Sequence, residues 1–199
     1  MIDDLDRTLE DLLKRELPSD LVSQVTISFA TPDGQFPPAS VTLPAIDLFL
    51  YDVRENADLR SNEWRLERAS DGTAVRKRPP VRVDCSYLIT AWPSENSTTP
   101  ARDEHRLIGE VMKALLRHAT IPPGVLYGSL EGQQPPLPTS TLQPGRLQSL
   151  AEFWQALGGK PKAALSYTVT IGIEPDIAIE AGPPVLEKTL KFRQGVGEG

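Results

Sequence analysis

The chain of 199 residues has one cysteine and two histidines, and only 6% of its side chains are aromatic. A single cysteine, Cys85, excludes an internal disulfide and a cage of metal-binding thiolates. Because Cys85 lies within an apolar strand pattern, we interpret it as a small buried hydrophobic residue. His105 and His118 lie 13 positions apart on one predicted helix. Two metal ligands on one helical face would need a shorter spacing, so the sequence predicts no metal site and no cofactor.

Long apolar runs are also missing. No stretch approaches the roughly 18 apolar residues that a transmembrane helix needs, and the acidic start at Met1–Asp4 is unlike a signal peptide. The net charge of -6 argues against sequence-independent binding of nucleic acid. Neither a Gly-x-Ser-x-Gly motif nor a phosphate-binding lysine loop occurs. We therefore expect a protein made and kept in the cytosol, with no transmembrane segment and no nucleic-acid partner.

Proline, in contrast, is abundant. The 19 prolines are about twice the usual share of roughly 5%, and several occur as Pro-Pro pairs. This pattern predicts long ordered loops or extended arms, too extended to serve the core of a monomer. The length and the hydrophobic share of 39% are those of a globular protein with a core of its own.

Periodicity predicts an α+β fold, a mostly antiparallel mixed sheet flanked by about three helices. Strand patterns cover residues 25–29, 46–53, 81–92 and 163–173, with shorter ones at 125–127 and 137–142. Strand 46–53 is apolar on both faces, which is typical of a central strand. Helix patterns cover residues 3–17, the stretch from Pro100 to a stop at Pro122, and the stretch from Pro144 to Leu157. The third helix is expected to face inward with Leu147, Leu150, Ala151, Trp154 and Leu157.

A basic hairpin is predicted between the second and third long strands. Its arms are residues 64–68 and 75–78, and Asp71-Gly72 is a turn signal. The arms carry five cations, which are Arg65, Arg68, Arg76, Lys77 and Arg78. One interpretation is a protruding, solvated hairpin whose charges prevent aggregation. The other is a partner-binding surface that docks an acidic protein.

Three aspartates lie within or at the ends of predicted core strands: Asp47, Asp52 and Asp84. Aspartates at such positions commonly cap turns or pair with a nearby arginine, and this structural interpretation is favoured. The remote alternative is a small hydrolase that uses Asp52 or Asp84 with His105. That alternative needs a deep pocket in which these groups converge. We expect no catalytic residue.

Five separate blocks resemble one family. They are residues 46–56, 79–92, 104–109, 154–162 and 165–170. Together they look like the cap, or tail-terminator, proteins of extracellular contractile injection systems, in the same order and spacing over about residues 1–175. None of the blocks is a catalytic signature. The predicted domains are accordingly a tail-terminator-like domain, 1–175, and a polar C-terminal tail, 176–199, which the resemblance does not cover.

The resemblance implies a structural function. Contractile injection particles have an inner tube inside a contractile sheath, and a terminator forms a hexameric ring on the end distal to the baseplate. There it stops polymerisation and links the sheath protein to the inner tube protein, which requires no chemistry. The alternative is another ring-forming adaptor of a tail-like machine, at the baseplate or at a head–tail joint.

Overall fold

A computed structural model describes residues 1–61, 63–68, 74–143, 149–174 and 179–180. The chain divides into two compact units. The first contains Met1–Arg60 and Val81–Ile173, and the second contains Ser61–Pro80 and Glu174–Gly199. Among the described helices, none combines the length and the apolar character needed to cross a membrane.

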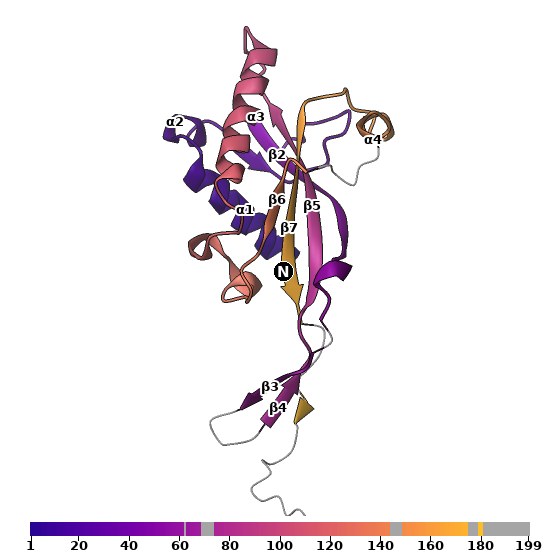
Figure 1. The fold of residues 1–199 in the computed structure, drawn as a ribbon. Helices are drawn as coiled ribbons and strands as arrows, with labels where there is room; N and C mark the ends of the chain where they lie inside the picture. Colours follow the sequence, from indigo (N-terminus) through magenta and orange to yellow (C-terminus); the bar gives the residue numbers. More distant parts are fainter. Residues whose placement is uncertain (62, 69–73, 144–148, 175–178, 181–199) are drawn as a thin grey trace, which may run out of the picture. The chain divides into compact units, whose positions relative to one another are not determined.

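A five-stranded sheet forms the centre of the first unit (Figure 1). Its strands, in spatial order, are β1 (Thr26–Ser28), β2 (Ala45–Glu55), β5 (Val81–Trp92), β7 (Ala164–Ile173) and β6 (Thr139–Thr141). The β1–β2 pair is parallel and the other neighbouring pairs are antiparallel. The predicted α+β class with a mostly antiparallel mixed sheet is confirmed.

The middle strand of the sheet is β5. Residues 46–53, predicted as a central strand, lie beside it in β2, between β1 and β5, and are fully buried only in the first part of β2. Between Arg82 and Ala91 every side chain of β5 is buried, since β2 and β7 flank it along its length. Among the described residues, those that pair with the outer side of β2 are the three of β1, and they cover it at Ala45–Asp47. The register of β2 against β5 also shifts between Leu50 and Asp52, which marks a bulge.

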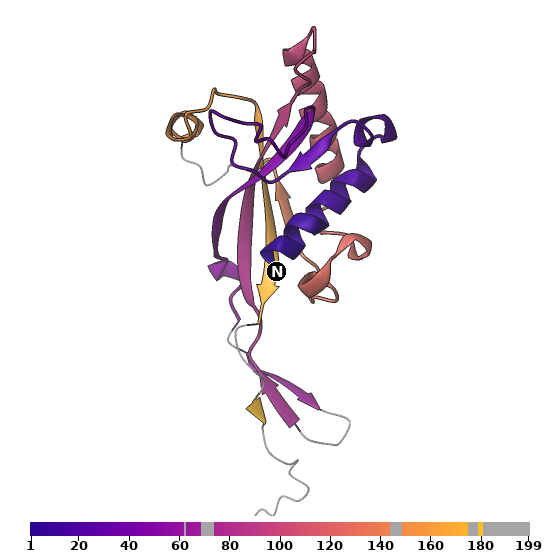
Figure 2. The same ribbon diagram turned by 180° about the vertical axis from the view of Figure 1, so that it is seen from behind.

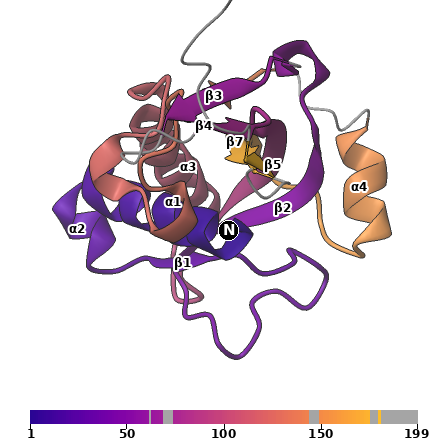
Figure 3. The same ribbon diagram turned by 90° about the horizontal axis from the view of Figure 1, so that it is seen from below.

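Two long helices, α1 (Ile2–Glu16) and α3 (Pro100–Leu116), cover one face of this sheet, together with the short α2 (Ser19–Val22) (Figures 1 and 3). The leucines that α1 turns toward the sheet are fully buried; they are Leu5, Leu9, Leu12 and Leu13. They pack with β5 residues that include Cys85 and Tyr87. Burial raises the pKa of the Cys85 thiol to about 11, in agreement with its interpretation as a buried hydrophobic residue.

Helix α4 (Leu150–Ala156) lies on the opposite face, as the views from behind and from below show (Figures 2 and 3). Its Phe153 ring contacts Phe49 and Tyr51 of β2. The helix begins at Leu150, after the Ser149 side chain that accepts a hydrogen bond from the Glu152 amide. The predicted start at Pro144 lies outside the described residues, as does Leu147.

The predicted inward stripe of this helix is wrong at Leu150 and Ala151 and right at Trp154, while Leu157 is partly buried. Trp154 is 2% exposed, whereas Leu150 is 47% exposed and Ala151 is exposed as well. A helix of seven residues buries little more than one large side chain against a sheet, so the longer amphipathic pattern overstated the contact.

The Pro-rich stretch after α3 is a long ordered loop, one of the two predicted forms, but it serves the core of its own chain, contrary to the expectation that it is too extended to do so. Helix α3 ends at Leu116, before the predicted stop, and Pro123–Val125 and Gly128–Leu130 form 3-10 turns where a strand was predicted at 125–127. Their Val125 and Leu130, with Leu137 further on, join the core cluster. Pro123 and the left-handed Gly128 favour these turns over an extended strand.

The second unit contains the predicted hairpin, β3 (Arg65–Arg68) and β4 (Ala74–Lys77), which pair antiparallel. A short strand β8 (Ile179–Glu180) pairs with β4 on the other side. The expected Asp71-Gly72 turn lies outside the described residues, and so does most of the predicted tail 176–199. The boundary predicted at residue 175 stays a prediction.

Candidate assembly surfaces

The basic hairpin is the surface that the sequence singles out. Its register places Arg65 opposite Lys77 and Leu66 opposite Arg76. The side chains of Arg65, Arg68, Arg76 and Lys77 lie outside the described part of the chain. The Arg78 guanidinium carbon lies 5.2 Å from the centre of the Trp64 ring, a cation–π contact at an exposed site.

Asp47 has a structural role at the start of β2. Its Oδ1 accepts hydrogen bonds from Ser28 Oγ at 2.7 Å and from the Ala30 amide at 3.0 Å, which ties the end of β1 to β2. The carboxyl group is completely buried. Burial raises the pKa of Asp47 to about 7, against the opposing effect of these two donors.

Asp84 and Asp52 have structural partners too. Asp84 Oδ1 accepts hydrogen bonds from Thr170 Oγ1 at 2.7 Å and from Asn56 Nδ2 at 3.1 Å, so it joins β5, β7 and the end of β2. Asp52 pairs with Arg54, whose Nε lies 2.6 Å from Asp52 Oδ2. Asp52 thus has an arginine partner, as the structural interpretation expects, whereas Asp47 and Asp84 are held by hydrogen bonds to other polar groups.

The hydrolase alternative fails on geometry. Asp84 alternates with Val83 and Cys85, which belong to the core under α1 and α3, so Asp84 faces the other side of the sheet. Asp52 pairs with Ser86 and shares that side. His105 is exposed on α3, and the sheet therefore separates it from both carboxylates.

The second histidine, possible metal ligands and the surface hollows also give no sign of a catalytic site among the described residues. His118 Nε2 lies 3.2 Å from Glu16 Oε1, a contact between α1 and the end of α3. Within the described ranges, no three acidic, histidine or cysteine side chains form a metal-binding group. Two surface hollows, of about 180 and 230 Å³, are lined by neither Asp52, Asp84 nor His105.

The two edges of the main sheet differ. Beyond Asp47, no described residue pairs with the outer side of β2, so this edge is open in the part of the chain that the structure describes. At the other edge, Thr139 of β6 donates its amide to the Ala119 carbonyl, which covers the outer side of β6. An open edge is a ready template for another strand, and the bulge in β2 limits this tendency.

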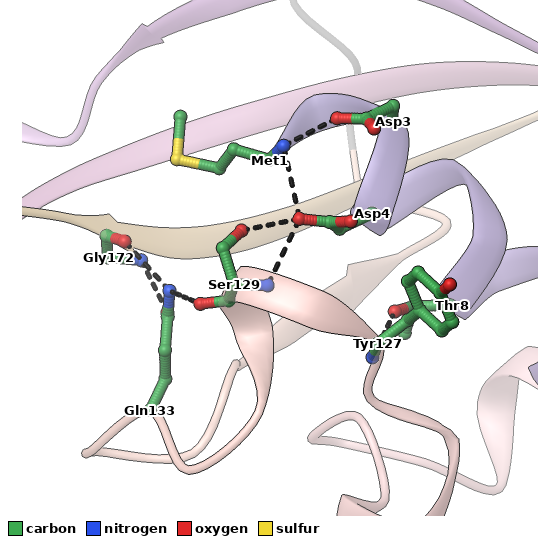
Figure 4. A network of polar contacts seen from close by, with 8 residues as sticks. All are labelled: Met1, Asp3, Asp4, Thr8, Tyr127, Ser129, Gln133 and Gly172. Carbon is green, nitrogen blue, oxygen red and sulfur yellow. Dashed lines mark hydrogen bonds and ion pairs between the residues drawn. The ribbon is translucent and has the colours of Figure 1, made fainter.

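A side chain seals the end of β7 (Figure 4). Gln133 Nε2 donates to the Gly172 carbonyl, and the Gly172 amide donates to Gln133 Oε1, both at 2.9 Å. These are the two bonds that a neighbouring antiparallel strand makes with one residue. The Gln133 side chain thus satisfies the backbone amide and carbonyl of Gly172 at this edge.

The same segment is attached to the start of α1. Asp4 Oδ2 accepts hydrogen bonds from the Ser129 hydroxyl at 2.7 Å and from its amide at 3.0 Å, and Thr8 Oγ1 accepts one from the Tyr127 amide at 3.1 Å (Figure 4). The Ser129 donors lower the pKa of Asp4 to about 2. No motif marked Gln133 or Asp4 in the sequence, because their partners lie far along the chain.

Comparison with known proteins shows to which family this chain belongs. The family model of the Pvc16 N-terminal domain matches residues 4–187. The chain belongs to the Pvc16 N-terminal domain family. No curated protein gives a significant match.

Two solved structures share the fold of this chain. One is the sheath/tube terminator of PVC, an extracellular contractile injection system, in its extended state; it matches with a TM-score of 0.69 and 24% identity over 100% of this chain. The other is the tube-terminating cap of the anti-feeding prophage, with a TM-score of 0.65 and 26% identity over 96% of this chain. The chain spans 65% and 61% of the lengths of these proteins.

Proposed function

We propose that this protein is the cap of a contractile injection system. Six copies form a ring on the baseplate-distal end, stop polymerisation of tube and sheath, and link the two. The observation that carries the proposal is the similarity to the anti-feeding prophage cap over 96% of the chain. The protein is made in the cytoplasm and becomes part of a particle, and its partners are the sheath protein, the inner tube protein and its own copies.

The physical features of the fold support this role. A closed ring needs two different surfaces on each copy, because neighbours pack head to tail. In the main sheet, β6 and Gln133 seal one edge, and the other edge is open beyond Asp47. The two edges therefore differ in the backbone groups that they offer to a neighbour. The predicted function needs no reaction, and the three core aspartates are occupied by structural contacts.

Removing the protein from a producing cell tests the proposal. Tube and sheath proteins should still be made, but their assemblies should vary in length or fall apart, because nothing occupies the growing end. A copy of the gene supplied in trans should restore uniform particles. Electron microscopy should then show six copies at the baseplate-distal end; normal particles without the protein, another symmetry, or a location at the baseplate would contradict the proposal.

We also propose that the basic hairpin docks on an acidic surface of the sheath or of a neighbouring copy. Reversing three charges together, with Arg76→Glu, Lys77→Glu and Arg78→Glu, should leave the monomer folded and weaken incorporation into particles. Exposed pairs contribute only about 0.2–1 kcal/mol each, so one substitution should have little effect. The defect should grow as salt is lowered, because screening then no longer masks the repulsion from the acidic surface.

A triple reversal of equal charge provides the control for the hairpin variant. Lys14, Arg60 and Lys160 are exposed, and Lys14 and Arg60 pair with carboxylates at the surface. Changing these three to Glu should leave incorporation near the wild-type level. If the hairpin variant is incorporated as well as the wild type across a salt series, its charges only solvate an edge.

A further inference from the structure

Gly109 lies in the interior of α3, and no contact within the described chain requires a glycine at this position. A Cβ built at this position meets no atom within 4 Å, and the residue is helical rather than left-handed. Glycine in a helix interior costs about 0.5–1 kcal/mol relative to alanine. Its lack of a side chain does allow another backbone to approach the helix closely.

The residues around Gly109 form a face of mixed character. At about 100° per residue, Arg102, Arg106 and Lys113 lie along one flank of Gly109. Met112 and Leu116 lie along the other flank, and Leu116 is 54% exposed. The opposite side of α3 is buried in the core, so this face points away from the sheet. We call Arg102, Arg106, Gly109, Lys113 and Leu116 the Gly109 face.

Two of the three ion pairs of this region have a cation that is more exposed than its carboxylate partner, whereas Arg106 and its partner Asp20 are equally exposed, at 61% and 63%. Lys113 is 57% exposed and its partner Glu110 is 24% exposed. Beyond the face, Arg117 is 54% exposed and its partner Glu16 is 18% exposed. Such surface pairs contribute little, so a desolvated carboxylate from another molecule can compete for these cations.

The charge of the remaining surface identifies the occupant. The first unit carries 19 acidic and 13 basic residues, and three of the basic ones belong to the Gly109 face, so the rest of the unit has a net acidic charge. Two Gly109 faces would repel each other, which disfavours a symmetric contact between them. A Gly109 face against an acidic side of a second copy is complementary. Because it joins two different surfaces, this contact repeats around a closed ring.

We propose that the Gly109 face is the surface through which each copy contacts an acidic side of the next copy. The proposal rests on the proposed ring. Gly109 lets the neighbouring backbone approach α3, Leu116 provides apolar contact, and Arg102, Arg106 and Lys113 receive carboxylates. The glycine thus reduces the stability of the free monomer slightly and is required by the assembled ring.

Gly109→Gln tests this surface in the full-length protein. Glutamine favours helix and has open space around it in the monomer, so the melting temperature should stay the same or rise. The ring, measured by mass photometry alone and in the presence of its tube, should decrease at least ten-fold. The matched control is Ala151→Gln, at an exposed helical position of α4, which should assemble as the wild type does.

A charge variant tests the same face independently. Arg102→Glu with Lys113→Glu should leave the monomer folded and should also reduce the ring at least ten-fold. If Gly109→Gln assembles like the wild type, or forms rings alone and fails only to bind the tube, the Gly109 face is not the contact between copies, while the cap function stands. If the wild type forms no ring either alone or on its tube, both proposals fail.

Discussion

Replacing Asp47 by Asn is expected to remove a large part of the pH dependence of folding stability. The pKa of the buried carboxyl is raised from 3.8 to about 7. Between these values the folded protein holds a proton that the unfolded chain has lost, so the free energy of unfolding rises as the pH falls from 7 toward 4. At 1.36 kcal/mol per pH unit, the wild type should gain about 3 kcal/mol relative to Asp47→Asn between pH 7 and pH 4.5.

Urea unfolding of both proteins at several pH values measures this difference. Subtracting the two curves cancels the titration of all other groups, as long as they titrate alike in both proteins. Asp11→Asn, at an exposed position of α1, serves as the control and should run parallel to the wild type. Parallel curves for wild type and Asp47→Asn would mean that Asp47 is ionised in the folded protein and that water reaches it.

Replacing Trp154 by Ala is expected to cost about 3–5 kcal/mol, the usual cost of deleting a buried aromatic side chain. Trp154 is 2% exposed, and a Cβ at Gly159 would lie 3.1 Å from its ring, so the chain folds tightly over it. The Gly159 amide also donates to the Trp154 carbonyl, and the Gly34 amide donates to the Leu157 carbonyl next to it. Losing the indole should therefore loosen α4 and the loop around Gly34 together.

Leu150→Ala on the same helix is the control, because Leu150 is 47% exposed and should change stability by no more than about 0.5 kcal/mol. Chemical denaturation gives the two losses, and hydrogen exchange shows whether the loop around Gly34 opens with α4. Similar losses for the two variants would restore the amphipathic stripe that the sequence predicted.

Long periodic elements were predictable from the sequence. Helix α1, strand β5 and strand β7 repeat their apolar residues over ten or more positions, so the period alone identifies them. Short elements were not. Val125 and Leu130 are apolar and lie in the core, but they reach it from 3-10 turns, which have no period to detect.

Of the candidate surfaces, the basic hairpin was predictable from the sequence and the others were not. A run of cations made the hairpin visible, because Arg76, Lys77 and Arg78 are consecutive. The Gln133 seal on Gly172 joins residues 39 positions apart, and the Asp4–Ser129 contact spans 125 positions. The sequence shows that residue 109 is a glycine, but only the structure shows that nothing in the described chain fills the space beside it.

By itself, the sequence determined the α+β class, the single buried cysteine and the resemblance to a cap, because these depend on composition, period and the order of local blocks. The tertiary structure alone decided which strand is central, which edge is sealed and which side of the sheet each aspartate faces. These properties depend on pairing between distant segments. A local pattern specifies how a strand buries its faces, but not which strand lies beside it.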